Sequence, residues 1–123
     1  MKVIVSAFGS SEEPTSQKAD PIATAQNLAN FVLKNHLDGA DIDWEDSSAM
    51  KDGSGAEWLI TFTRKLRELL PGKIITHAPQ GPYFNEELYP RGGYTKVHNN
   101  VGNLIDFYNI QFYNQESTTY DTY

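Results

Sequence analysis

The stretch Asp38-Gly-Ala-Asp-Ile-Asp-Trp-Glu45 contains the most informative pattern in the sequence. Successive side chains of a β-strand point to opposite faces, so a strand here would place Asp41, Asp43 and Glu45 on one face. The other face would be apolar and would consist of Ala40, Ile42 and Trp44. A buried strand, with a helix against its apolar face and its acids in a polar cavity, fits both faces. Carboxylates confined together must share protons or hydrogen bonds, which suits acid–base chemistry. A solvated acidic strand end is the simpler alternative.

The composition limits the classes of protein to consider. A chain of 123 residues is long enough for one domain with a modest core, and 39% hydrophobic with 21% charged residues is typical of a globular protein. A net charge of −6 without basic clusters argues against nucleic acid as a partner. The absence of cysteine excludes disulfides and thiolate metal sites. No apolar run is long enough for a membrane span, and Met1-Lys2 leads into a strand-like segment, not a signal peptide.

Strand and helix patterns alternate along the chain. Apolar and β-branched runs predict buried strands at residues 2–8, 39–45, 73–78 and 105–113. The first predicted helix begins at Asp20-Pro21, which supply a cap and a first residue, and continues to about Asn35 with a stripe of Ile22, Ala25, Ala29 and Val32. The second opens at Ser54 or Gly55 and is stopped by Pro71-Gly72, and a short third helix is predicted within 94–104. The segments 46–55 and 81–93 are predicted to be loops.

This order of elements predicts an α/β fold with a parallel sheet and right-handed crossovers. A doubly wound sheet is the alternative to a barrel, but no Gly-x-Gly-x-x-Gly or phosphate-loop pattern follows any predicted strand. In both folds ligands bind at the carboxyl ends of the strands, where Glu45 lies.

Several motifs resemble those of one enzyme family. Asp38, Asp41, Asp43 and Glu45 fill the Asp-x-x-Asp-x-Asp-x-Glu signature of glycoside hydrolase family 18, the chitinases and endo-β-N-acetylglucosaminidases. The runs that resemble the class III, hevamine-like branch are Ala78-Pro-Gln80 and Gln111-Phe-Tyr-Asn114, which are similar to its fifth and sixth strands. Ser6-Ala-Phe-Gly9 resembles the Ser-x-Gly-Gly of the third strand but lacks its first Gly. The resemblance implies a parallel β/α unit similar to half of an eight-stranded β/α barrel, with residues 1–123 as a partial catalytic domain.

The resemblance also implies a role for each acid. Glu45 would be the general acid in hydrolysis of β-1,4-N-acetylglucosamine linkages of chitin. The nucleophile in this family is the N-acetyl carbonyl of the substrate itself. Asp43 would hold the acetamido N–H and stabilise the oxazolinium, and Asp41 would share a proton with Asp43. Tyr113 would donate its hydroxyl to the acetamido carbonyl, although a core aromatic residue with a solvated hydroxyl is the alternative.

The remaining candidate residues bind sugar or support the fold. Gln111, Asn114 and Gln80 are candidate sugar-binding groups, while Asp38 and Gly39 are expected to support the entry to the strand. No cofactor or metal is implied, and the three histidines have no metal-ligand spacing. Binding of a divalent cation by the acid cluster is the alternative, but the loop Gly of a calcium hand is missing. The two tryptophans, Trp44 and Trp58, are expected in the core.

The family resemblance implies chitin or another N-acetylglucosamine glycan as the partner, and an extracellular location. An endo-β-N-acetylglucosaminidase that acts on N-glycans and a non-hydrolysing, chitin-binding lectin stay open as alternative functions. The predicted strands match the third to sixth of the family barrel, so two strand edges, at 2–8 and 105–113, are expected to be open. A homodimer or an association with complementing barrel segments would cover them.

Overall fold

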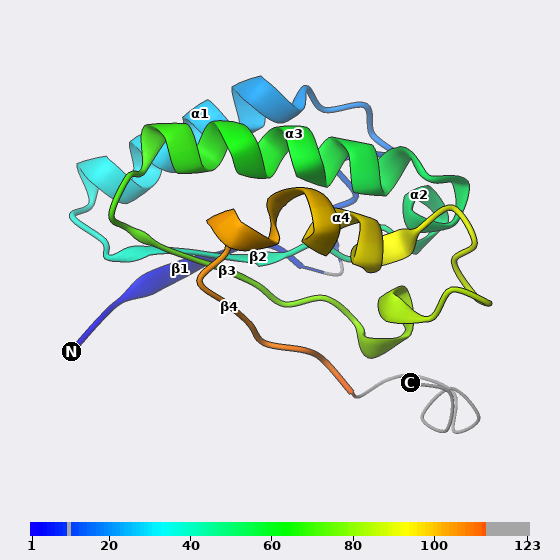
Figure 1. Ribbon diagram of the computed structural model, residues 1–123. Coiled ribbons are helices and arrows are strands. Elements are labelled where there is room, and N and C mark those ends of the chain that lie inside the picture. The colour runs from blue at the N-terminus through cyan, green and yellow to red at the C-terminus, as the bar shows by residue number, and fades with distance from the viewer. Residues whose placement is uncertain (10, 113–123) are drawn as a thin grey trace.

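The computed structural model describes residues 1–9 and 11–112 (Figure 1). The described strands are β1 (Ile4–Phe8), β2 (Gly39–Asp43), β3 (Ile74–His77) and β4 (Phe107–Tyr108). The described helices are α1 (Pro21–Lys34), α2 (Ser47–Asp52), α3 (Ser54–Leu69) and α4 (Gly93–Val101), with short 3₁₀ helices η1 (Gly81–Phe84) and η2 (Gly102–Leu104). Apart from α2, strands and helices therefore alternate in the order that the sequence predicts.

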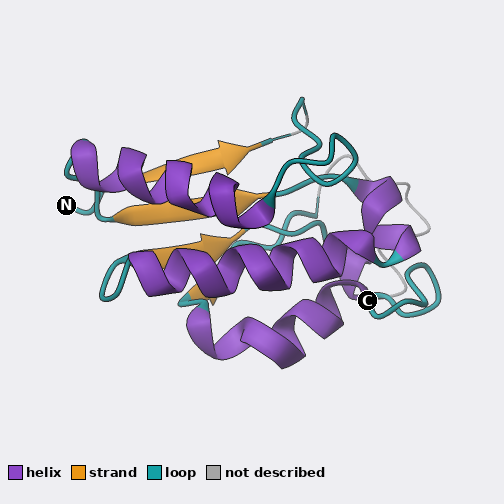
Figure 2. Cartoon of the chain, turned by 90° about the horizontal axis from the view of Figure 1, so that it is seen from above, coloured by secondary structure: helices purple, strands orange, loops and turns teal. Residues whose placement is uncertain are grey.

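The strands form one parallel sheet in the order β1-β2-β3-β4, and their arrows point the same way in Figure 2. The register places Ser6 beside Asp41 and Asp41 beside Thr76. Because side chains of the same parity share a face, this register aligns three polar side chains across three strands. The predicted parallel α/β unit is confirmed.

The described helices lie on one side of the sheet, with α1, α3 and α4 side by side over the strands (Figures 1 and 2). The buried faces of these helices pack against the apolar face of β2 and against Trp44, the residue after β2. Ala40, Ile42 and Trp44 are fully buried there. Trp44 and Trp58 are both core residues, as predicted. The acids of β2 have the opposite parity and face away from the helices.

Three local features fix the start of α1 and the pairing of the strands. Asp20 caps α1, because its carboxylate accepts a hydrogen bond from the N–H of Ala23 at 2.9 Å. Gly39 is required for strand pairing, since a Cβ there would lie 1.9 Å from the carbonyl oxygen of Ile74. The carboxylate of Asp38 accepts from the N–H of Val3 at 2.7 Å, which fastens the start of β1 to the start of β2.

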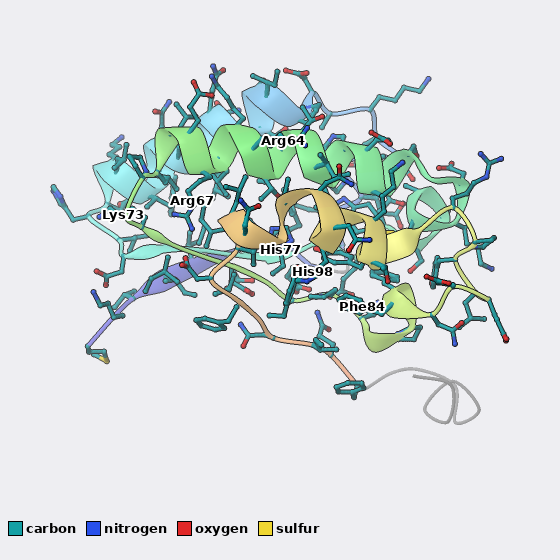
Figure 3. The ribbon with its side chains drawn as sticks, viewed as in Figure 1. Arg64, Arg67, Lys73, His77, Phe84 and His98 are labelled. Atoms are coloured by element: carbon teal, nitrogen blue, oxygen red, sulfur yellow. The ribbon has the colours of Figure 1, made fainter. Side chains whose placement is uncertain are left out.

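At the amino end of the sheet, Arg67 joins α3 to the chain around β3 and β4 (Figure 3). Its guanidinium donates to the carbonyl oxygens of Leu70, Lys73 and Leu104 at distances of 2.7 to 3.2 Å. It also pairs with Asp106 at 3.0 Å. At this end of the sheet, the N–H groups of the Arg67 guanidinium are therefore all directed at protein acceptors.

Three predictions about local structure are wrong. The predicted loop 46–55 contains α2, which buries Ala49 and Met50 and ends where Gly53 adopts a left-handed conformation. Within the described residues 105–112 of the predicted strand 105–113, pairing as β4 is limited to Phe107–Tyr108, and one further bridge joins Gln80 to Gln111. Ile22 is not part of the buried stripe of α1, since 43% of it is exposed. None of the described helices is long and apolar enough to cross a membrane.

Candidate active site

Asp41 lies at the centre of the open face of the sheet and is held by neutral donors from three other strand segments. Its Oδ1 accepts from the Thr76 hydroxyl on β3 at 2.6 Å and from the amide of Asn109 at 3.5 Å. Its Oδ2 accepts from the Ser6 hydroxyl on β1 at 3.4 Å. The carboxylate is thus oriented by neutral hydroxyl and amide donors.

Asp43 and Glu45 lie further toward the carboxyl end of β2 and interact directly. Burial raises the pKa of Glu45, and a hydrogen bond to Asp43 and the negative charge of Asp43 raise this pKa further. Hydrogen bonds from Gln111 and Gln80 lower it in part. Glu45 therefore stays protonated at a higher pH than an ordinary glutamate does, which is the state that a general acid requires.

Gln111 connects the acid pair to the neighbouring strands. Its Nε2 donates to Asp43 Oδ1 at 2.7 Å and to the carbonyl oxygen of Ala78 at 2.6 Å. Gln111 is 8% exposed, and its backbone forms a bridge to Gln80. Gln111 therefore orients the carboxylate of Asp43, and it also lines the space in front of that carboxylate.

A cleft of about 410 Å³ opens in front of Asp41, Asp43 and Gln111. Its volume is within the range of small-molecule sites in proteins. The residues that line it are Asp41, Asp43, Ala78, Asn109, Ile110 and Gln111.

Within the described part of the chain, the acids of the cleft are not paired with cations. The ion pairs within the described part of the chain are Lys65–Glu68, Arg67–Asp106 and Lys96–Glu57, and none includes a cleft residue. Residues 1–9 and 11–112 also contain no group of His, Asp and Glu arranged to hold a metal ion. Neutral hydrogen-bond donors and the raised pKa of Glu45 therefore limit the repulsion among the acids, which favours acid–base chemistry.

The structure brings together Asp41, Asp43, Glu45, Gln80 and Gln111 from the predicted site. Asp38 lies apart, at the amino end of β2, and Gly39 is in contact with the backbone of β3. The predicted site residues Tyr113 and Asn114 lie outside the described residues.

Sequence reasoning did not identify Ser6, Thr76 and Asn109 as partners of Asp41. The alternation within each predicted strand contained the signal, because these polar side chains have the parity that faces the acids once the strands are in register. His77, the residue after Thr76 on β3, faces the helices instead (Figure 3). There it contacts Thr63 and Tyr94. Burial lowers its pKa to about 3, so it is neutral at physiological pH.

Phe8 occupies the position at which the Ser-x-Gly-Gly pattern has its first Gly. Its φ is +79°, in the left-handed region that favours glycine. The ring packs against Trp58 and Phe62 with centroid distances of 5.8 and 5.7 Å. Gly9 follows with its N–H directed at the carbonyl oxygen of Asp43 at 2.8 Å. The backbone therefore adopts the conformation for which a glycine is suited, although the residue is aromatic.

The model of glycosyl hydrolases family 18 matches residues 2–122 of this sequence. This chain belongs to that family. The crystal structure of a GH18 chitinase from Pseudoalteromonas aurantia is similar with a TM-score of 0.85 and 41% identity, covering 95% of this chain and 45% of that chain. The sheet and its helices therefore correspond to half of the family 18 barrel.

Two curated relatives of this family 18 chain come from fungi. Secreted chitinase LysM12 of Penicillium expansum is 38% identical over 80 residues, which are 59% of this chain and 5% of that protein. The killer toxin subunits alpha/beta of Kluyveromyces lactis are 34% identical over 74 residues, which are 54% of this chain and 6% of that protein. The chain thus spans about half the length of its solved relative and a small part of the fungal ones.

Proposed function

We propose that this family 18 domain hydrolyses β-1,4-N-acetylglucosamine linkages in chitin, with Glu45 as the general acid. The observation that supports this function best is the raised pKa of Glu45, which interacts with Asp43 and Gln111, two residues that line the cleft. A protonated carboxyl next to an acceptor can deliver a proton to a leaving oxygen. The neutral amide and hydroxyl donors around the cleft are also suited to an uncharged sugar.

The proposed reaction begins when Glu45 donates its proton to the glycosidic oxygen. The N-acetyl carbonyl oxygen of the substrate then forms a bond to the anomeric carbon as the glycosidic bond breaks. Asp43 accepts from the acetamido N–H and stabilises the positive oxazolinium that results. In the second step water attacks the same carbon, the bond from this carbon to the acetamido oxygen breaks, and the water gives its proton to the Glu45 carboxylate. The acetamide is regenerated, and the anomeric configuration is retained.

The other residues of the proposed site have supporting roles. Asp41 shares a proton with Asp43 and so adjusts the charge beside the oxazolinium. Gln111 and Gln80 bind the sugar or orient the acids. The proposed hydroxyl donor to the acetamido carbonyl is Tyr113, with Asn114 as a further sugar-binding group.

The state of assembly is also part of the proposal. β1 and β4 are the edges of the described sheet, and three side chains at β4 and just beyond it are exposed. These are Phe107, Ile110 and Phe112. Unpaired strand edges promote association, so the active form would have further strands against them, from a second copy or from complementing barrel segments. Sedimentation at micromolar concentration tests this, and a compact, fully active monomer would contradict it.

The location follows from the proposed substrate. Chitin is an extracellular polymer, and one relative carries the name of a secreted chitinase. We therefore include an extracellular location in the proposal. Detection of the native protein in the culture fluid or the cell wall, compared with a cytoplasmic marker, would test it.

The decisive test is digestion of N-acetylchitotetraose followed by NMR of the fresh products. Substrate assistance requires that the β-anomer forms first and that thiazoline analogues of the oxazoline inhibit. Initial formation of the α-anomer would contradict the mechanism. Binding of the tetramer without any cleavage would instead favour the lectin, and cleavage of a high-mannose glycopeptide in preference to the tetramer would favour the N-glycan enzyme.

A further inference from the structure

Asp46, the residue after Glu45, is a buried carboxylate whose partners lie in another part of the chain. It is only 1% exposed and stands at the N-cap position of α2, yet its side chain makes no capping hydrogen bond. Capping is the usual use of Asp at this position. Instead, Oδ2 accepts from the N–H of Ser16 at 2.6 Å, and Oδ1 accepts from the Ser16 hydroxyl at 2.7 Å and the Ser48 hydroxyl at 3.3 Å. Both oxygens are therefore bound to Ser16, in the loop between β1 and α1.

Trp44, the residue before Glu45, is bound to the same loop. Its indole Nε1 donates to the hydroxyl of Thr15 at 3.3 Å, and its ring is fully buried. The loop also contains backbone hydrogen bonds of its own, which limit its movement. The two sequence neighbours of Glu45 are thus both held by the consecutive residues Thr15 and Ser16.

Glu45 needs such support because of its place in the chain. It lies in the connection 44–46 between β2 and α2, outside both elements, where the backbone bond to α2 runs from the N–H of Met50 to the carbonyl oxygen of Asp46 at 3.0 Å. Its carboxyl must nevertheless stay within hydrogen-bond reach of Asp43, Gln80 and Gln111. A displacement of about 1 Å at a reacting group can lower a rate by about 10²-fold.

We propose that the paired hydrogen bonds between Ser16 and Asp46 position Glu45 for proton transfer. This inference rests on the proposed function and makes Ser16 and Asp46 positioning residues, since neither has to touch the substrate. Loss of the pair lets the connection 44–46 shift and moves Glu45 away from Asp43. Turnover then falls while the affinity for sugar, which depends on other contacts in the cleft, changes little. The basic limb of the pH–rate profile also moves to lower pH, because Glu45 loses part of the environment that keeps it protonated.

The chain offers a matched control at the other end of α2. There Asp52 accepts from the N–H and the hydroxyl of Ser54 at 2.8 and 2.6 Å, in an exposed position away from the cleft. The experiment compares Asp46→Asn and Ser16→Ala with Asp52→Asn and Ser54→Ala in the purified chain. The measurements are kcat, KM and the pH profile on N-acetylchitotetraose, together with the melting temperature.

We expect kcat to fall about 10-fold or more in Asp46→Asn and about 3-fold in Ser16→Ala, with KM within about 2-fold of the wild type and both control variants unchanged. Folded Asp46→Asn and Ser16→Ala proteins with wild-type kcat and an unmoved basic limb would overturn the proposal, whatever their melting temperatures. If Asp46→Asn does not fold, Ser16→Ala decides the question, because it keeps the amide donor.

A readout without turnover separates this inference from the proposed function. The carboxyl carbon of Glu45 can be titrated by NMR in the wild type and in Ser16→Ala. A lower titration midpoint in Ser16→Ala supports the positioning role even if no substrate is cleaved, in which case only the proposed function fails. An identical midpoint in the two proteins overturns the positioning role even if the wild type is an active chitinase.

Discussion

Carboxylates at the two ends of the sheet have different kinds of partners. At the amino end, Asp38 accepts a backbone N–H, and Asp106 accepts the N–H of Ile75 and pairs with Arg67. At the carboxyl end, Asp43 and Glu45 interact with each other and with neutral amide groups. The partners of Asp106 lower its pKa and favour its charged form, whereas the surroundings of Glu45 raise its pKa and favour a retained proton.

The amino end of the sheet contributes to stability, whereas the carboxyl end contains the acids of the candidate site. Hydrogen bonds and the Arg67 pair lower the pKa of Asp106, so its ionised form stabilises the fold. This contribution is present above the ordinary aspartate pKa and is lost as the pH falls through the lower pKa of the folded state. Glu45 has the opposite sign, because its raised pKa means that ionisation costs stability as the pH rises. A carboxyl group with a raised pKa thus lies at one end of the sheet, and a carboxylate with a lowered pKa and a cationic partner lies at the other.

The largest effect expected at the carboxyl end comes from Glu45→Gln. The amide keeps the shape but has no transferable proton, so kcat should fall by about 10²-fold or more, while binding of the oligosaccharide survives. The melting temperature should not fall, and above neutral pH it should rise because a costly ionisation is removed. Glu57→Gln is the control, since Glu57 is exposed on α3 and pairs with Lys96. Wild-type turnover in Glu45→Gln would refute the role of Glu45.

The largest effect expected at the amino end comes from Arg67→Met. Several carbonyl oxygens and Asp106 lose a charged donor, and the free energy of unfolding should fall by about 2 to 4 kcal/mol. The matched control is Arg64→Met, one turn earlier on α3 and exposed, which should change stability by less than about 0.5 kcal/mol. Denaturant unfolding measures both. If Arg67→Met lowered kcat of the folded protein while leaving stability intact, the division between the two ends would be wrong.

A smaller effect is expected from Thr76→Val, which removes the 2.6 Å hydrogen bond to Asp41 without a large change in shape. We expect kcat to fall about 3- to 10-fold, because one net hydrogen bond is typically worth about 0.5 to 1.5 kcal/mol. Thr63→Val makes the same substitution on the helix side of β3, where Thr63 contacts His77. It should lower stability and leave kcat unchanged. Equal kcat values for the two variants would show that Asp41 needs no such support.

The parts of the fold that could be predicted from the sequence are those with regular patterns. Alternation in 38–45 placed the acids on one face and Ala40, Ile42 and Trp44 in the core. Local chemistry also predicted the start of α1, where Asp20 caps the helix. These features depend on near neighbours in the chain, so they are visible without tertiary structure.

The parts that could not be predicted depend on distant contacts. α2 is only six residues long, and its burial of Ala49 and Met50 and the link from Asp46 to Ser16, 30 residues away, are tertiary interactions. β4 contains only Phe107 and Tyr108 in the described part of the chain, and a side chain, the carboxylate of Asp106, accepts the N–H of Ile75 on β3. The left-handed backbone of Phe8 likewise has no signal in a residue type that normally avoids it.

One NMR titration of the side-chain carboxyl carbons tests the contrast between the two ends most directly. Both Glu45 and Asp106 are followed in the same sample as the pH is changed. The account predicts that Glu45 titrates above the ordinary glutamate value of 4.5 and that Asp106 titrates below the ordinary aspartate value of 3.8. Ordinary midpoints for both residues, or a Glu45 midpoint below 4.5, would contradict it.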